Sequence, residues 1–157
     1  MAHGLEKVLE RLRGFDPSPL VPAAPRDAAL DGLIAALDAP PAARSALHLW
    51  NDSLVRCHDL AQEIHDPTGS YLHGVMHRRE PDYPNAKYWF RKVGTHPLFP
   101  DVLRAAGAVE ALRTSAWDPF KMVDLCEEAA GDPALEKALR EVQAREIERL
   151  AAFCLRA

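Results

Sequence analysis

Residues 68–97 read TGSYLHGVMHRREPDYPNAKYWFRKVGTHP, and the interpretation of the whole chain depends on this stretch. It holds three of the seven histidines, five of the nineteen lysines and arginines, and one of the three tryptophans. The flanking sequence is mostly rich in alanine, with apolar residues at helical spacing. Polar and aromatic side chains this dense, on helices that must bury one face, predict a functional site within the stretch.

Proline and glycine divide the stretch into two helices. Pro81 cannot continue a helix, so a helix is predicted over 67–80 and a second over 84–93. Gly94 is suited to the end of the second helix, because glycine adopts the left-handed conformation found there. The sequence therefore predicts a helical hairpin that turns at Pro81.

The same rules divide the rest of the chain. Aspartate precedes proline at 66–67, 118–119 and 132–133, where the carboxylate caps free N–H groups and proline suits the first helical position. The other predicted helices cover residues 5–13, 28–37, 42–65, 100–113, 118–130 and 132–155. Strand-like alternation is absent from the sequence. The prediction is an all-α fold of seven or eight helices, arranged as a compact bundle with helical hairpins.

Length and composition predict one soluble domain. A chain of 157 residues can bury a core without staples, and 1–26 is expected to form a short helix and a proline-rich arm that pack on it. The net charge of -4 disfavours nucleic acid as a partner, and no apolar run approaches the length needed to span a bilayer. Three widely spaced cysteines argue against a disulfide framework, so a cytoplasmic location is expected. The oligomeric state stays open.

Three of the polar residues have the spacing of a metal site. His73, His77 and Glu80 lie at positions i, i+4 and i+7, within about 60° of one another around a helix. Two imidazoles and a carboxylate suit zinc, iron, manganese or nickel. If the chain folds back at Asp66, His58 of the preceding helix lies opposite and becomes a further ligand. A metal-free polar site and histidines with purely structural roles remain alternatives.

Basic and aromatic residues of the stretch suggest an anionic substrate. Arg78, Lys87 and Arg91 are expected to hold a carboxylate or phosphate, with Trp89 lining the pocket. For proton transfer the candidates are His77, Tyr88 and His96. A solvent-exposed basic face, with no ligand at all, is the alternative for the cations.

Two resemblances rest on the same residues. Gly74, Ala86 and Phe90 have the spacing of the packing positions in a tetratricopeptide-type helical hairpin, so this part of the chain resembles one such hairpin. The resemblance implies that His73 and His77 face inward. The longer string HGVMHRRE…NAKYWFRKVGTHP looks like the motif of an uncharacterised family of small bacterial proteins, and it carries no activity with it.

The leading hypothesis is a small cytosolic enzyme with a histidine-rich site, metal-dependent or working by acid–base chemistry. Its substrate would be a small anionic molecule bound between the helices predicted at 42–65, 67–80 and 84–93. The alternative is a helical interaction module, without catalysis, that docks an acidic partner through a basic aromatic surface. The two hypotheses differ in whether the imidazoles of His73 and His77 converge on one pocket.

Overall fold

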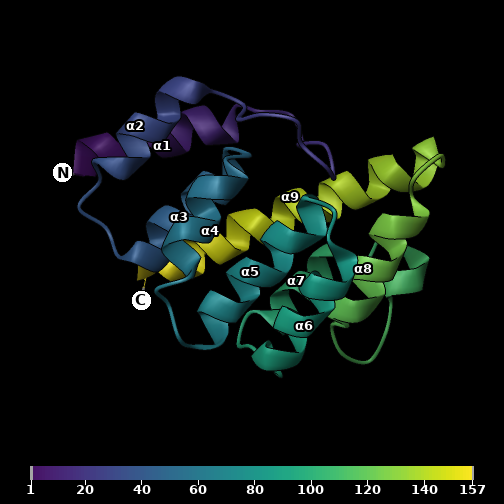
Figure 1. Ribbon diagram of the computed structural model, residues 1–157. Coiled ribbons are helices and arrows are strands. Elements are labelled where there is room, and N and C mark those ends of the chain that lie inside the picture. The colour runs from purple at the N-terminus through teal and green to yellow at the C-terminus, as the bar shows by residue number, and fades with distance from the viewer. Residues whose placement is uncertain (1, 157) are drawn as a thin grey trace.

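The structure is a computed structural model that describes residues 2–156, and helices are its regular secondary structure within that range. The all-α prediction is confirmed, while the predicted count of seven or eight helices is too low for the described residues (Figure 1). The nine α-helices and one 3-10 helix are α1 (Ala2–Arg13), α2 (Ala28–Ala35), α3 (Pro41–Trp50), α4 (Leu54–Ala61), α5 (Pro67–Arg79), α6 (Tyr83–Val93), α7 (Phe99–Ala105), η1 (Glu110–Leu112), α8 (Pro119–Glu128) and α9 (Pro133–Arg156).

The extra helix arises because the helix predicted over 42–65 is broken. Residues 51–53 form a turn, in which Asp52 has a left-handed φ of 61° and the Ser53 N–H donates to the His48 carbonyl at 2.9 Å. Asparagine and aspartate adopt this conformation more readily than other residues with a side chain. The turn lets α4 run in its own direction, which decides where His58 lies relative to α5.

The helix ends agree with the predicted signals. Asp66, Asp118 and Asp132 each accept a backbone N–H two or three residues later, at 2.9, 3.0 and 3.2 Å. These caps begin α5, α8 and α9. Gly94 follows α6 with a positive φ of 65°, as expected of glycine at a helix C-terminus.

The long helix α9 crosses the molecule, and shorter helices pack along it (Figure 1). It contacts α3, α7 and α8, while α5 packs against α3, α4 and α6. The chain between α1 and α2 runs over the body, where the Pro19 carbonyl accepts from Arg79 at 3.1 Å and the Pro17 carbonyl accepts from Arg140 at 2.9 Å. No helix of residues 2–156 is long and apolar enough to cross a membrane.

Two consecutive buried arginines fix the rotation of α5 about its axis. The guanidinium of Arg78 lies 2.8 Å from the carboxylate of Glu146 on α9, and both side chains are buried. Arg79 pairs with Asp52 at 2.7 Å and is likewise buried. Because Arg78 pairs with α9 and Arg79 pairs with the turn before α4, α5 is held by two different parts of the structure. Its histidines are thereby directed towards α4 and α6.

The helices α5 and α6 pack tightly at Gly74. A Cβ added there would lie 2.7 Å from ring atoms of Phe90, which is closer than packed carbons can approach. Phe90 is buried and also packs edge-on against Tyr71, with ring centroids 5.9 Å apart. Glycine at this position therefore sets the separation of the two helices that carry the candidate site.

We expect Gly74→Ala to lower the free energy of unfolding by about 1–3 kcal/mol, because the added methyl overpacks the interface with Phe90. The matched control is Gly32→Ala on α2, where an added Cβ meets nothing within 4 Å. Alanine there should leave stability unchanged or raise it by about 0.4–1 kcal/mol. Urea denaturation measures both, and equal effects of the two substitutions would contradict the tight packing at Gly74.

For the buried pair of Arg78 and Glu146, we expect Glu146→Leu to cost roughly 3–5 kcal/mol, because it leaves a buried guanidinium without its counter-charge. The double variant Arg78→Met, Glu146→Leu removes both charges and should lose less stability than Glu146→Leu alone. Urea denaturation of the two variants and of Arg78→Met gives the coupling energy. Simple additivity of the two single effects would show that the charges do not interact.

Candidate functional site

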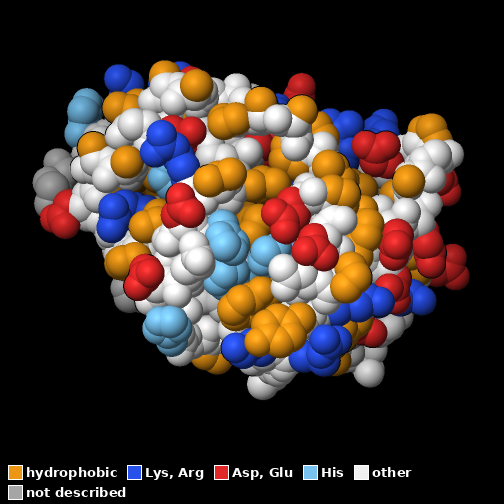
Figure 2. All heavy atoms as spheres, viewed as in Figure 1, with side chains coloured by type: hydrophobic (Ala, Val, Ile, Leu, Met, Phe, Trp, Pro, Cys, Tyr) orange, Lys and Arg blue, Asp and Glu red, His pale blue; other side chains and the backbone are white. Residues whose placement is uncertain are grey.

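Three histidines from two helices converge at the surface between α4, α5 and α6. The ring centroid of His58 lies 5.0 Å from the ring centroid of His73 and 5.3 Å from that of His77. The centroids of His73 and His77 are 5.8 Å apart. One ring nitrogen from each residue can be chosen so that all three lie within 4.8 Å of one another. Figure 2 shows histidine side chains gathered near the middle of this face, with acidic side chains close by. We call these three residues the histidine cluster.

The sequence brings the cluster together in two steps. His73 and His77 are one helical turn apart on α5, and both are buried. After α4 the chain folds back, and this places partly buried His58 of α4 next to the rings of His73 and His77 on α5. The structure therefore brings His58 to the place that the sequence predicted for it.

Glu80 contacts the cluster from outside. Its Oε1 lies 2.5 Å from Nδ1 of His77, and it forms a separate group with His77 and Asp82 in place of joining His58 and His73. A carboxylate can only accept, so Nδ1–H of His77 donates and Nε2 keeps its lone pair. Asn85 lies beside the same ring, and its Nδ2 can donate to Nε2 of His77 at 3.4 Å. Glu80 thus orients a histidine, where the sequence predicted a direct ligand beside His73.

His73 is an uncharged imidazole at neutral pH. Burial lowers its pKa to about 4, and the neighbouring rings of His58 and His77 add to the effect. The ring stacks on the indole of Trp89 with centroids 3.8 Å apart and planes 8° from parallel. Its Nδ1 is buried and has no hydrogen-bond partner among the described residues. A neutral imidazole with one ring nitrogen left unsatisfied is suited to bind a cation.

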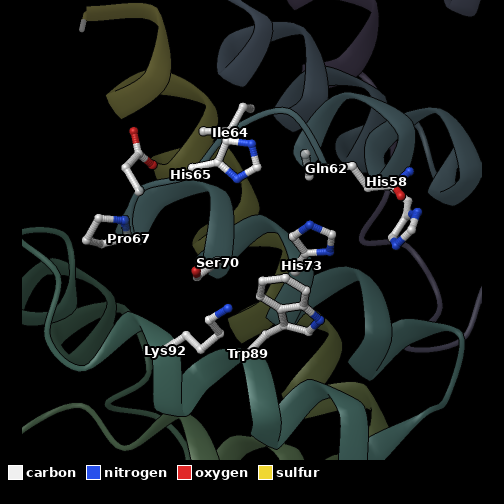
Figure 3. Close-up of a pocket in the computed structure, with 11 residues that line it drawn as sticks. His58, Gln62, Ile64, His65, Pro67, Ser70, His73, Trp89 and Lys92 are labelled. Atoms are coloured by element: carbon white, nitrogen blue, oxygen red, sulfur yellow. The ribbon is translucent and has the colours of Figure 1, made fainter.

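A cavity of about 550 Å³ adjoins the cluster, and Figure 3 shows the side chains that line it. His58 and His73 lie at one end and Trp89 forms part of the floor, while Pro67 lies at the other end. The polar side chains that line it are those of His58, Gln62, His65, Asp66, Ser70, His73 and Lys92. Two of the three cluster histidines, His58 and His73, therefore line a space large enough for a small molecule.

Lys92 is the cation of this cavity wall. Its Nζ lies 4.9 Å from the centroid of Trp89 and 5.4 Å from that of Tyr88, so the ammonium rests on aromatic faces. Lys92 is one of the five lysines and arginines of residues 68–97, but the sequence prediction assigned the anion to Arg78, Lys87 and Arg91. The signal that would have found it is the spacing of Asn85, Trp89 and Lys92, which repeats the i, i+4, i+7 pattern of the histidine helix.

Lys87 and Arg91 lie elsewhere, so the predicted approach of these two residues to the histidines is wrong. They line a different cavity of about 360 Å³ beside Glu127, and Lys87 pairs with Asp124 at 2.6 Å. The reason is the burial of Ala86, Phe90 and Val93 on α6. With that stripe in the core, Trp89 falls on one flank of the helix and Lys87 on the other.

The prediction that Arg78 binds substrate does not hold either. Its side chain is 1% exposed and its guanidinium donates to Glu146 and Gln143 in the core. The charge that the sequence assigned to an anionic ligand is therefore used inside the protein. Among the predicted substrate contacts, Trp89 is the one that lines the cavity next to the cluster.

Tyr88 and His96 do not reach the cavity. Tyr88 is 46% exposed and touches Trp89 edge-on, on the outer side of α6. His96 is buried, and its Nδ1 accepts the Leu98 N–H at 3.1 Å, so the proton is on Nε2, which lies 3.0 Å from the Thr68 hydroxyl. Burial also lowers the pKa of His96. Its position makes it a neutral, structural histidine, and the predicted reach back into the site does not occur.

The buried histidines predict how stability depends on pH. His48, His73 and His96 all have lowered pKa values because they are buried. In the unfolded chain each takes up a proton near the ordinary histidine pKa of about 6.5. The unfolded state therefore binds more protons just below that pH, and we expect full stability above about pH 6.5 and a progressive loss as the pH falls towards 4.

Urea denaturation of chelator-treated protein between pH 7.5 and 4.5 measures this loss. The variant His96→Gln should flatten part of the slope, because it removes one of the three groups. His65→Gln, which changes an exposed histidine, serves as the control. A free energy of unfolding that stays constant over this range would contradict the lowered pKa values.

Comparison with known proteins gives no family to which the chain can be assigned. No protein-family model, curated protein or solved structure matches it. A function therefore has to be argued from the cluster, its partners and the adjoining cavity.

Proposed function

We propose that this protein is a small enzyme that binds one divalent transition metal through His58, His73 and His77 and acts on a small anionic molecule in the adjoining cavity. The observation that carries the proposal is the convergence of three imidazoles, whose ring nitrogens lie within 4.8 Å of one another. Three protein ligands with a coordination position left open are typical of catalytic zinc sites, whereas structural sites are closed by four.

The protonation state of the cluster supports the proposal. A histidine must be neutral to bind a metal, and burial keeps the pKa of His73 near 4. The Nδ1 atom of His73 is buried without a partner among residues 2–156, which costs free energy in the metal-free protein. A cation bound at Nδ1 would give this nitrogen the partner that it lacks.

The contact of Glu80 with His77 supports it further. Histidine ligands in metal sites usually donate their second N–H to a carboxylate or carbonyl, which fixes the ring and raises its basicity. The 2.5 Å contact from His77 Nδ1 to Glu80 Oε1 has this form. In the proposed site Glu80 is therefore a positioning residue, and the three imidazoles are the ligands.

The ligand set favours some metals and one class of reaction. Imidazole nitrogens suit zinc, iron or nickel better than calcium or magnesium, which prefer oxygen. Such an ion polarises carbonyl and phosphoryl oxygens and lowers the pKa of water, which is the chemistry of hydrolysis. The chain supplies a partly enclosed cavity beside the cluster, with Trp89 as a rigid wall and Lys92 as a cation for the substrate.

The interaction-module alternative has less support. It requires Lys87, Trp89 and Arg91 to line one open groove. Trp89 instead lies against His73, while Lys87 and Arg91 belong to a second cavity on the other flank of α6. A basic aromatic docking surface would thus be divided between two faces.

Metal titration tests the proposal. We expect chelator-treated protein, without an affinity tag, to bind one equivalent of Zn²⁺ or Co²⁺, with a rise in melting temperature and a tetrahedral-type cobalt absorption spectrum. Glu80→Gln should weaken binding by about 10–100-fold, as loss of an orienting partner does in other metal sites. His73→Ala and His77→Ala should weaken it more. His65→Gln, which changes an exposed cavity histidine outside the cluster, is the matched control.

Activity is tested on the same samples. Hydrolysis of p-nitrophenyl phosphate and of p-nitrophenyl carboxylate esters should depend on added metal and should be lost in His77→Ala. A protein that binds no metal above trace, or whose variants bind it as the wild type does, would overturn the metal centre. Metal binding without hydrolysis of any anionic ester would leave a metal-binding protein and overturn the proposed reaction class.

A further inference from the structure

We infer that Lys92 anchors an oxyanion beside the histidine cluster, so that the cavity binds a metal ion and a small carboxylate or phosphate cooperatively. This inference rests on the proposed function, because it concerns the second ligand of the same site. It assigns anion binding to Lys92 in place of the residues Arg78, Lys87 and Arg91 that the sequence prediction selected. It also explains why metal-type ligands and a cation lie together in one cavity.

The charges of the site require an anion once a metal is bound. The three cluster histidines contribute no negative charge, and Glu80 is the carboxylate that touches them. A divalent ion and Lys92 would therefore leave an excess of positive charge at this end of the cavity. Asp66, the carboxylate among the residues that line the cavity, is already used as the N-cap of α5. A small oxyanion is the ligand that balances these charges.

The position of Lys92 allows it to play this part. Its ammonium lies over Trp89 at 4.9 Å, and Trp89 stacks on His73 at 3.8 Å, so the cation and a cluster ligand contact the same indole. Lys92 has no ion-pair partner within 4.0 Å in the described part of the chain. Figure 3 shows its side chain extending into the cavity between Ser70 and Trp89.

The other cations near the hairpin cannot substitute for it. Arg78 and Arg79 are buried in ion pairs with Glu146 and Asp52. Lys87 faces Asp124 on the opposite flank of α6. The cavity beside the cluster has Lys92 as its one lysine or arginine among residues 2–156. Selectivity for an anion at this site therefore depends on a single residue.

Cooperativity follows from the arrangement. An anion held at Lys92 is attracted by the charge of the nearby metal ion, so it binds better when the metal is present, and thermodynamic linkage requires it to raise the metal affinity by the same factor. Because Lys92 is exposed, salt and solvent screen part of the effect. We expect the factor to be about 5–10-fold, at the low end of typical couplings between sites.

Zinc affinity measured by competition with a chromophoric chelator, at constant ionic strength, tests the inference. The probes are inorganic phosphate and acetate, with chloride as the reference anion. In the wild-type protein phosphate or acetate should raise the zinc affinity about 5–10-fold. Phosphate also binds free zinc, which lowers the apparent affinity, so this side reaction cannot imitate the expected increase.

Variants at position 92 test whether Lys92 causes the rise in zinc affinity with phosphate or acetate. Lys92→Met should bind zinc at least as tightly as the wild type in chloride, since a nearby positive charge is gone, and should lose the increase with phosphate or acetate. Lys92→Arg should keep it. Lys87→Met, which removes a lysine of the same helix on the other flank, should behave as the wild type. Circular dichroism and melting temperature verify that each variant is folded.

The possible outcomes separate this inference from the proposed function. If zinc binds but neither anion raises its affinity, or if Lys92→Met keeps the full increase, the role of Lys92 is wrong and the metal centre stands. If the protein binds no zinc in any buffer, both fail. A response to phosphate alone identifies a phosphate site, and a response to acetate alone identifies a carboxylate site.

Discussion

The close approach of α5 and α6 at Gly74 is the constraint on which the rest of the site depends. Because residue 74 has no side chain, the ring of Phe90 lies directly against the α5 backbone. The same contact puts the stripe of Ala86, Phe90 and Val93 into the core. Trp89 is then next to His73, and the cavity wall follows from that stacking. A wider separation of these helices would leave the histidines without their aromatic partner.

The rotation of α5 is determined by charges that have no contact with the cavity. Arg78 and Arg79 are neighbours in sequence, yet one pairs with Glu146 on α9 and the other with Asp52 in the turn before α4. A buried guanidinium without its carboxylate is strongly unfavourable, so few other rotations of α5 are tolerated. His77 directly precedes these two residues. Two ion pairs in the core thereby hold the cluster in position.

The candidate site combines features that seem opposed when only residue types are considered. Imidazoles that bind a cation lie beside a lysine that repels one. The geometry separates their tasks, since the three rings converge on one point while the ammonium rests over Trp89 and faces the cavity. A metal and an oxyanion bound together would satisfy both. The cavity is therefore better described as a site for two ligands than as a metal cage.

The sequence by itself determined the all-α class, the hairpin about Pro81, the aspartate caps before proline and the stripe of His73 and His77. These features depend on local chemistry, namely backbone propensity, capping and helical spacing. The tertiary structure alone decided that α4 is a separate helix, that Arg78 lies in the core and that Lys92 replaces Lys87 and Arg91 beside the cluster. Such choices depend on which stripe of each helix is buried against its neighbours. The amphipathic pattern of α6 leaves both flanks polar. Only the packing of α6 on α5 and α8 therefore decides which flank lies beside the histidine cluster.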